Sequence, residues 1–161
     1  MKLVLGLAFI SVFASSPIAA QEAIVSAADR EALRQQFARW GHQPSALEVS
    51  EGMPLFSATI SGIGTAVVLG GCTDGRNCSH MAFVATYTDV RNPPYEWLNQ
   101  HNFDYNLVTV MRRADGLLSL RSGIFLGNGV RVSAMQLALE DWVAVNAEII
   151  ASARDSGLVS K

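Results

Sequence analysis

The sequence contains two cysteines, Cys72 and Cys78, which lie six positions apart in a short run rich in Gly, Asp and Asn. Such a pair fits three kinds of chemistry: a disulfide, a metal site built on thiolates, or a redox-active thiol. A zinc site needs at least a third ligand, and the nearby candidates are His80 and Asp74, in an order that matches no established zinc-finger spacing. A redox pair is typically Cys-x-x-Cys at the start of a helix, which is a shorter spacing in a different context.

The N-terminal segment bears on this choice because it indicates the compartment. A positively charged start, an apolar run and a small, turn-prone stretch follow one another within residues 1–20, which is the pattern of a secretory signal peptide. We expect cleavage after Ala20, with a cut after Ser16 as the alternative. Exported proteins meet an oxidising environment, where an even number of cysteines favours disulfides. We therefore predict a disulfide between Cys72 and Cys78 in a protein of the Gram-negative periplasm.

The other candidates for catalysis do not form a recognisable constellation. His42, His80 and His101 are scattered, and the sequence contains no Gly-x-Ser-x-Gly, His-Glu-x-x-His or phosphate-loop motif. Glu140 and Asp141 are adjacent, and neighbours on a helix point in different directions. A cysteine nucleophile partnered by His101 stays open, because such partners are close in space and not in sequence. We expect no enzymatic activity, no catalytic residues, and no metal or cofactor.

The composition describes an ordinary globular domain. The chain has 161 residues, of which 50% are hydrophobic and 16% charged, with a formal net charge of -2. One domain over residues 21–161 is the expectation for this length. A nucleic-acid partner is not expected, because phosphate binding requires clustered cations and Arg112-Arg113 is the one adjacent basic pair in the sequence. No run after the signal peptide reaches eighteen apolar residues, so we expect no membrane association after cleavage.

Two capping patterns predict helices at the two ends of this domain. Ser26 and Asp29 have the spacing of a capping box, and an apolar stripe at helical spacing follows them as far as Trp40. Ser133 and Gln136 repeat the pattern and open the longest helix of the chain.

The region between them predicts strands and one short helix. Asn92 is expected to cap a helix that ends near Asn102, and Gly116 lies in a hairpin turn. The expected strands cover residues 46–50, where the alternation is weak, 55–60, 65–69, 81–88, 105–112 and 117–121, the last with an extension through Phe125 left open. The cysteine run joins the third and fourth of these as antiparallel neighbours. The order predicts an α+β fold: an antiparallel sheet of about five strands with N-terminal, short middle and long C-terminal helices.

A family resemblance is carried by the stretch from Trp97 to Trp142. The order along it is Asn99-Gln100-His101-Asn102, then Ala114-Asp115-Gly116, then a glycine-rich loop over residues 127–133, then a long helix with Trp142. This order resembles the C-terminal half of the YbjN family, bacterial proteins whose fold is similar to that of type III secretion chaperones. In that family an Asn-x-Trp-Asn run precedes a hairpin with Asp-Gly at its turn, a Gly-Gly-Val-Ser-like loop and a long helix with a tryptophan. This chain departs from the pattern at His101, where the family usually has Trp, and its glycine loop is longer by two residues.

The resemblance implies a function class but no mechanism. It implies a domain without known catalytic residues, linked to sensing, regulation or chaperone-like binding, and it is compatible with a homodimer. If the resemblance holds, His101 and Asn102 form a hydrogen-bonding corner or contact a ligand. The alternative is that they cap the C-terminus of the middle helix. The family-motif positions are Trp97, Asn99, Asn102, Gly116, Gly129, Ser133 and Trp142.

These observations together predict a non-enzymatic periplasmic domain, similar to YbjN, that binds a protein or peptide. The alternative is a small enzyme or metal-binding protein that uses the loop of Cys72, Cys78 and His80.

Overall fold

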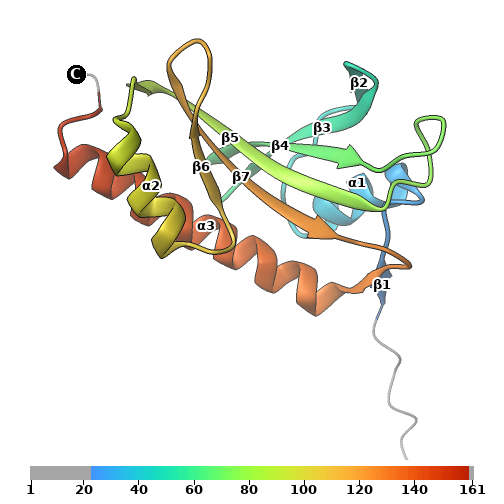
Figure 1. The fold of residues 1–161 in the computed structure, drawn as a ribbon. Coiled ribbons are helices and arrows are strands. Elements are labelled where there is room, and N and C mark those ends of the chain that lie inside the picture. The colour runs from blue at the N-terminus through green and yellow to red at the C-terminus, as the bar shows by residue number, and fades with distance from the viewer. Residues whose placement is uncertain (1–22, 160–161) are drawn as a thin grey trace, which may run out of the picture.

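The computed structural model describes residues 23–159, so the predicted signal peptide over residues 1–20 lies outside the described part. Three helices and a large antiparallel sheet make up this part, which confirms the predicted α+β fold and the order of its helices (Figure 1). The elements are β1 (Ile24–Val25), α1 (Arg30–Arg39), β2 (Glu48–Ser50), β3 (Met53–Ile60), β4 (Ile63–Gly70), β5 (His80–Arg91), α2 (Tyr95–Asp104), β6 (Thr109–Arg112), β7 (Leu117–Phe125), β8 (Val130–Arg131) and α3 (Val132–Asp155).

The main sheet has six strands in the order β2-β3-β4-β5-β7-β6, and every neighbouring pair is antiparallel. Its side chains alternate between two faces, as strand geometry requires. Along β3, for example, Phe56, Ala58 and Ile60 are buried, whereas Ser57 and Thr59 are exposed. The short edge strand β2 lies within the strand expected over residues 46–50, and the chain reverses after it at Glu51 and Gly52, both at positive φ. The sheet has six strands where about five were expected.

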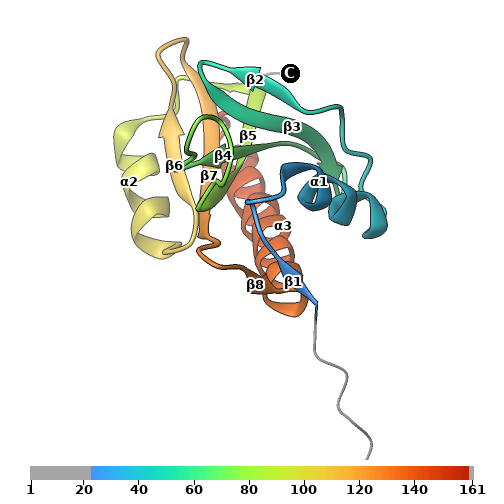
Figure 2. The ribbon, with the colours of Figure 1, turned by 90° about the vertical axis from the view of Figure 1, so that its right-hand side faces the viewer.

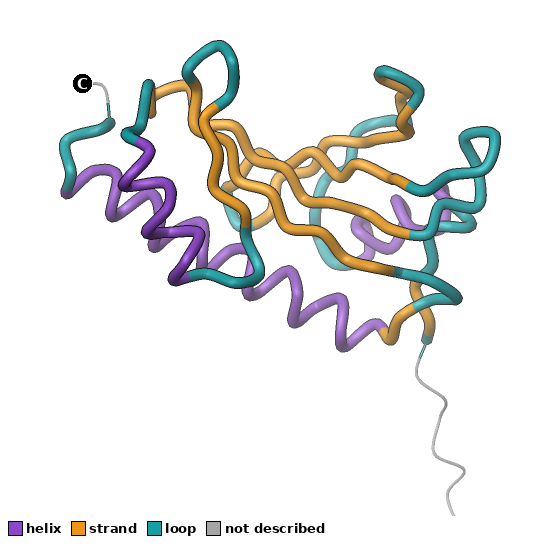
Figure 3. The backbone as a smooth tube through the Cα atoms, viewed as in Figure 1, coloured by secondary structure: helices purple, strands orange, loops and turns teal. Residues whose placement is uncertain are grey.

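The helices pack against the buried face of this sheet (Figures 2 and 3). Phe37 of α1 places its ring 5.2 Å from that of Phe56 and 6.2 Å from that of Phe83. Trp142 of α3 lies 5.8 Å from the Phe83 ring, and its Nε1 donates a hydrogen bond of 3.1 Å to Thr65 Oγ1. The apolar stripes predicted for the two end helices therefore meet in one core with β3, β4 and β5.

A second, two-stranded sheet pairs β1 with β8 and was not predicted. Strands of two residues show no alternation that a sequence pattern could reveal. Gly129 stands directly before β8 at φ +113, and a Cβ there would collide with Ile24 Cγ2. The glycine is therefore required by the close approach of β1.

The predicted N-caps of α1 and α3 lie at the wrong residues. The N-cap of α1 is Asp29, whose side chain accepts a hydrogen bond from Ala32 N (2.9 Å), while Ser26 Oγ accepts one from Ala28 N (3.1 Å). The N-cap of α3 is Arg131, because the chain enters this helix directly from β8.

The middle helix also begins later than expected. Its N-cap is Pro94 in place of Asn92, which has φ +50 and donates its N–H to Gly116 O (2.7 Å) in the neighbouring hairpin. Tyr105 is the C-cap of this helix, so β6 begins at Thr109 and not at residue 105. No helix within residues 23–159 is long and apolar enough to cross a membrane.

Candidate functional site

The cysteine run forms the loop between β4 and β5, and the predicted disulfide between Cys72 and Cys78 is confirmed. Within the ring, Thr73 and Arg76 exchange two backbone hydrogen bonds of 2.7 and 2.9 Å, which closes a tight turn. With the sulfurs bonded to each other, neither is a thiolate in this structure. Across residues 23–159, no group of three or more His, Cys, Asp and Glu side chains is placed to hold a metal ion.

His80 follows the loop as the first residue of β5 and lies against the backbone of β4. A Cβ on Gly70 would come within 2.8 Å of the imidazole, so the ring can take this position because residue 70 is glycine. The imidazole Nδ1 is 2.9 Å from Ser79 Oγ, and the ring stacks at 6.5 Å on Phe125 of β7. His80 and Phe125 thus form one wall of a hollow next to the disulfide.

This hollow lies on the face of the sheet opposite the three helices, and we call it the sheet groove. Its volume is about 650 Å³. Its floor is shallow because Val68, Ala82 and Gly123 are paired in one row across β4, β5 and β7, and two of these residues are small. The groove is lined by residues that include Met53, Val68, Gly70, Cys72, Gly75, His80, Ala82, Arg121, Gly123 and Phe125.

The ends of the open face are raised. In Figure 1 the disulfide loop and the β6–β7 hairpin project from opposite ends of the sheet, both on the side away from α3. The rim carries two large apolar side chains, Met53 and Phe125, which are 43% and 73% exposed. A neighbouring hollow of about 580 Å³ continues along the same face over Ser57, Ala66 and Val84. The open face therefore offers a long surface on which apolar and polar side chains alternate, with its most apolar part at the sheet groove.

Arg121 lies at the end of the sheet groove that is farther from the disulfide loop. It is two residues from Gly123 on β7, which makes it the cation nearest to the groove floor along the strands. It is paired with Val84 of β5 and Thr109 of β6, both uncharged. The ion pairs within residues 23–159 are Arg34 with Glu31 and Arg113 with Asp115, so Arg121 has no carboxylate partner in the described part.

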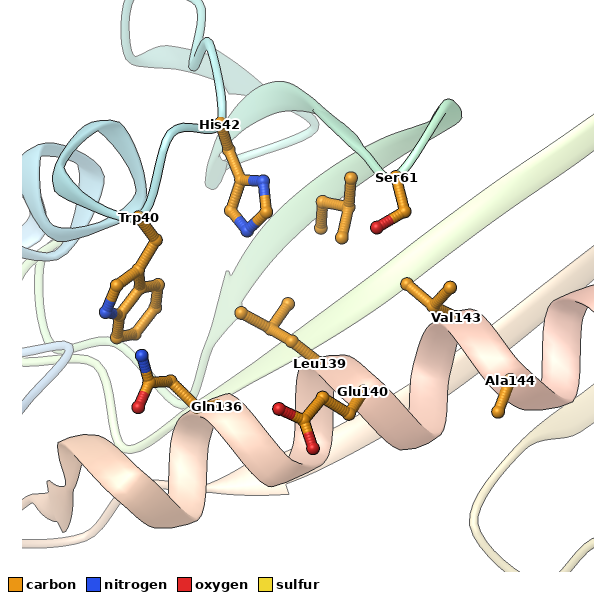
Figure 4. Close-up of a pocket in the computed structure, with 9 residues that line it drawn as sticks. Trp40, His42, Ser61, Gln136, Leu139, Glu140, Val143 and Ala144 are labelled. Carbon is orange, nitrogen blue, oxygen red and sulfur yellow. The ribbon is translucent and has the colours of Figure 1, made fainter.

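A second cleft, of about 390 Å³, lies between the end of α1, the β3–β4 turn and α3 (Figure 4). Figure 4 shows Trp40, His42 and Leu139 pointing toward one another, with Glu140 and Gln136 at the rim. Burial lowers the pKa of His42, and a hydrogen bond to the backbone of Thr59 opposes this shift in part. The cleft is lined mainly by apolar side chains. Trp40, the last residue of the predicted apolar stripe, is half-buried: it packs against the core and also lines this cleft.

His101 belongs to a hydrogen-bonded cluster between α2 and α3 that sequence reasoning missed in part. Its Nδ1 is 2.8 Å from Trp97 O, which can only accept, so Nδ1 carries the proton and Nε2 accepts from Ser152 Oγ at 3.0 Å. Trp97 Nε1 donates to the same Ser152 oxygen at 3.2 Å. A serine beside a histidine has the form of a nucleophile and its base. Here the Ser152 oxygen already accepts a hydrogen bond from Trp97, and the cluster links α2 to α3.

Asn102 closes the edge of the sheet. Its Nδ2 donates to Val110 O (2.8 Å) and its Oδ1 accepts from Val110 N (2.7 Å), so the amide replaces a further strand beside β6. Asn102 thus forms a hydrogen-bonding corner with the backbone of β6, which differs from a helix cap.

The other family-motif positions are distributed over the fold. Asn99 is exposed on α2 and Ser133 lies in the first turn of α3. Gly116 has φ +83 in the β6–β7 hairpin, where a Cβ would come within 2.5 Å of Asn92 Oδ1. Trp142 is buried against the sheet. None of the seven motif positions lines the sheet groove or the second cleft.

Comparison of the chain with protein-family models, curated proteins and solved structures finds no match. The resemblance to the YbjN family therefore stays a prediction, and the function has to be argued from the geometry of the described residues.

Proposed function

We propose that this protein is a non-enzymatic domain of the periplasm that binds a peptide or a segment of another protein on the sheet groove. The observation that carries the proposal is the open face of the six-stranded sheet. Sheets are normally covered on each apolar face by another layer. Here α1 and α3 pack on one face, whereas no helix or strand within residues 23–159 covers the other face. On that face Val68 and Val84 are half-buried, and Ala82 is buried in the floor of the groove.

The kinds of residue around the groove also favour binding. Protein interfaces are enriched in aromatic residues, Met and Arg. The groove has Phe125 and Met53 on its rim and Arg121 at the end farther from the disulfide loop. Larger apolar patches bounded by polar residues typically mark interaction sites.

The alternative enzyme or metal site on the cysteine loop is less well supported by the geometry. The nearest nucleophile and base are Ser79 and His80, and the imidazole has no other hydrogen-bond partner within residues 23–159 to orient it. The disulfide is consistent with an oxidising compartment, which supports the periplasmic assignment.

Site-specific photocrosslinking tests the proposal with two matched phenylalanines. Phe125 lies on the groove rim, and Phe103 lies on α2, away from the groove; they are 73% and 82% exposed. Each is replaced in turn by p-benzoylphenylalanine, an aromatic of similar shape, and the protein is irradiated in living cells. We expect discrete adducts from position 125 that are absent from position 103. Identical adducts from both positions, or none from either, would refute binding at the groove.

The second cleft supplies a further control. Val143→Glu places a charge in the cleft between α1 and α3 and leaves the sheet groove unchanged. Adducts from position 125 should persist in this variant. Their loss would assign the binding site to the cleft.

A further inference from the structure

The charges on the open face indicate what kind of segment the sheet groove binds. The residues that surround Arg121 on this face carry no charge: Val84 and Thr109 lie directly beside it, and Ser119 and Gly123 precede and follow it on the same side of β7. A guanidinium in such a position is a cation on an uncharged, largely apolar surface, and nothing in the described part neutralises it.

The acidic residues near this face do not neutralise Arg121. Glu48 lies on β2, four strand positions from β7, which corresponds to about 19 Å at the usual spacing of strands. Glu51 in the β2–β3 turn and Asp74 in the disulfide loop form no ion pair with any residue in the range 23–159. Two further cations belong to this face: Arg113 is paired with Asp115, and Arg91 lies opposite Leu117, four residues along β7 from Arg121.

Guanidinium groups bind carboxylates through two parallel hydrogen bonds, and such pairs are stronger beside an apolar surface than in open water. The floor of the groove begins one row away from Arg121, because Gly123 is two residues further along β7. Two residues of a strand span about 7 Å. A carboxylate bound by Arg121 therefore leaves an apolar side chain one or two residues away over Val68, Ala82 and Gly123.

From this arrangement we infer that the groove binds an acidic peptide segment, in which an Asp or Glu side chain pairs with Arg121 and an adjacent apolar side chain fills the hollow. The inference rests on the proposed function and adds the chemistry of the partner. The complementary charge is the observation that selects an acidic segment over a neutral or basic one.

Selection from a random heptapeptide library displayed on phage tests this chemistry without a known partner. The library is selected on the purified wild-type protein and in parallel on Arg121→Gln, Arg121→Lys and Gly123→Val. We expect wild type to enrich peptides with Asp or Glu within two residues of an aliphatic or aromatic residue. Arg121→Gln should lose the acidic bias, Arg121→Lys should retain it in part, and Gly123→Val, which fills the floor, should enrich no such peptides.

The outcomes separate the two proposals. Peptides that wild type enriches without acidic bias, and that Gly123→Val does not enrich, would overturn this inference and leave peptide binding at the groove intact. Equal enrichment on wild type and Gly123→Val would overturn both. A dimer of the free protein that Gly123→Val converts to monomers would also overturn the inference, since a second copy would then occupy the groove.

An enriched peptide is then synthesised with a fluorescent label and titrated by anisotropy. Arg121 is exposed in the free protein, and the proposed peptide covers it on binding. Truncating one member of a charge pair that binding removes from water typically weakens binding strongly, so we expect about a tenfold loss for Arg121→Gln. The same peptide with Gln in place of its acidic residue should bind wild type and Arg121→Gln equally. If the Gln peptide still bound wild type tenfold more tightly than Arg121→Gln, Arg121 would act without a carboxylate partner. That result would refute the proposed pairing of Arg121 with an acidic side chain.

Discussion

Replacement of Gly123 by valine distinguishes binding at the sheet groove from general damage to the fold. Gly123 lies in β7 and does not have a positive φ, and a Cβ added there meets no other atom within 4 Å. The valine methyl groups would occupy the floor of the groove beside Ala82. The change therefore fills the proposed site from a position where the added Cβ meets no neighbouring atom.

The expected effect on stability is small and positive. Glycine inside a strand is destabilising by roughly 0.5–1 kcal/mol, and β-branched residues are favoured there. We expect Gly123→Val to raise the free energy of unfolding by about 0.5–1 kcal/mol and Tm by about 2–4 °C. Binding of an enriched peptide should weaken at least tenfold, because the apolar side chain loses its place.

Urea denaturation, thermal melting and fluorescence anisotropy measure these quantities on the same preparation. Gly64→Val is the matched control: Gly64 lines the neighbouring hollow on the same face and not the sheet groove, and it has no positive φ and no heavy atom within 4 Å of an added Cβ. It should stabilise the protein similarly and retain binding. Unchanged affinity of Gly123→Val would refute the groove as the site, and a lower Tm would refute the conclusion that its floor is open.

Three further predictions concern parts of the fold outside the groove floor. Thiol titration of the denatured, unreduced protein should find no free thiol in Cys72 or Cys78, and Cys→Ser replacement of both should cost about 2 kcal/mol, as expected for a ring of this size; one or two free thiols would contradict the disulfide. Asn102→Ala should lower the free energy of unfolding by about 1–3 kcal/mol in urea, because it leaves both polar groups of Val110 without a partner; a loss below 0.5 kcal/mol would show that water replaces the amide. The pKa of His42 is lowered in the folded protein, so the unfolded state binds the proton more readily and stability should fall as pH drops from about 7 to 5. His42→Asn should flatten that slope, and an unchanged slope would assign it to another group.

Much of the fold follows from local patterns in the sequence. The apolar stripe ending at Trp40 and the alternation after Met81 predicted a helix and a strand that the structure confirms. The positions of the caps were wrong, because Asp29 and Arg131 take the N-cap through the path of the chain and not through the capping pattern. The two-stranded sheet of β1 and β8 left no pattern, since it pairs residues more than one hundred positions apart.

Of the candidate site, the sequence predicted the disulfide but not the groove beside it. The spacing of Cys72 and Cys78, together with the predicted signal peptide, predicted the disulfide. The floor of the groove was not predicted, although the apolar run over residues 65–69 is typical of a strand with apolar side chains on both faces. Such a run shows that a second apolar face exists, but not whether another element covers it.

The sequence by itself determined the compartment expected for the protein, the class of its fold and the disulfide, because each depends on residues close together in the chain. Only the tertiary structure decided that α1 and α3 pack on the same side of the sheet and leave the other side open. It also decided that Val68, Ala82, Gly123 and Arg121, from three strands, meet beside the disulfide loop. That meeting depends on strand order and register, which arise from contacts between distant segments and are not encoded in any short stretch.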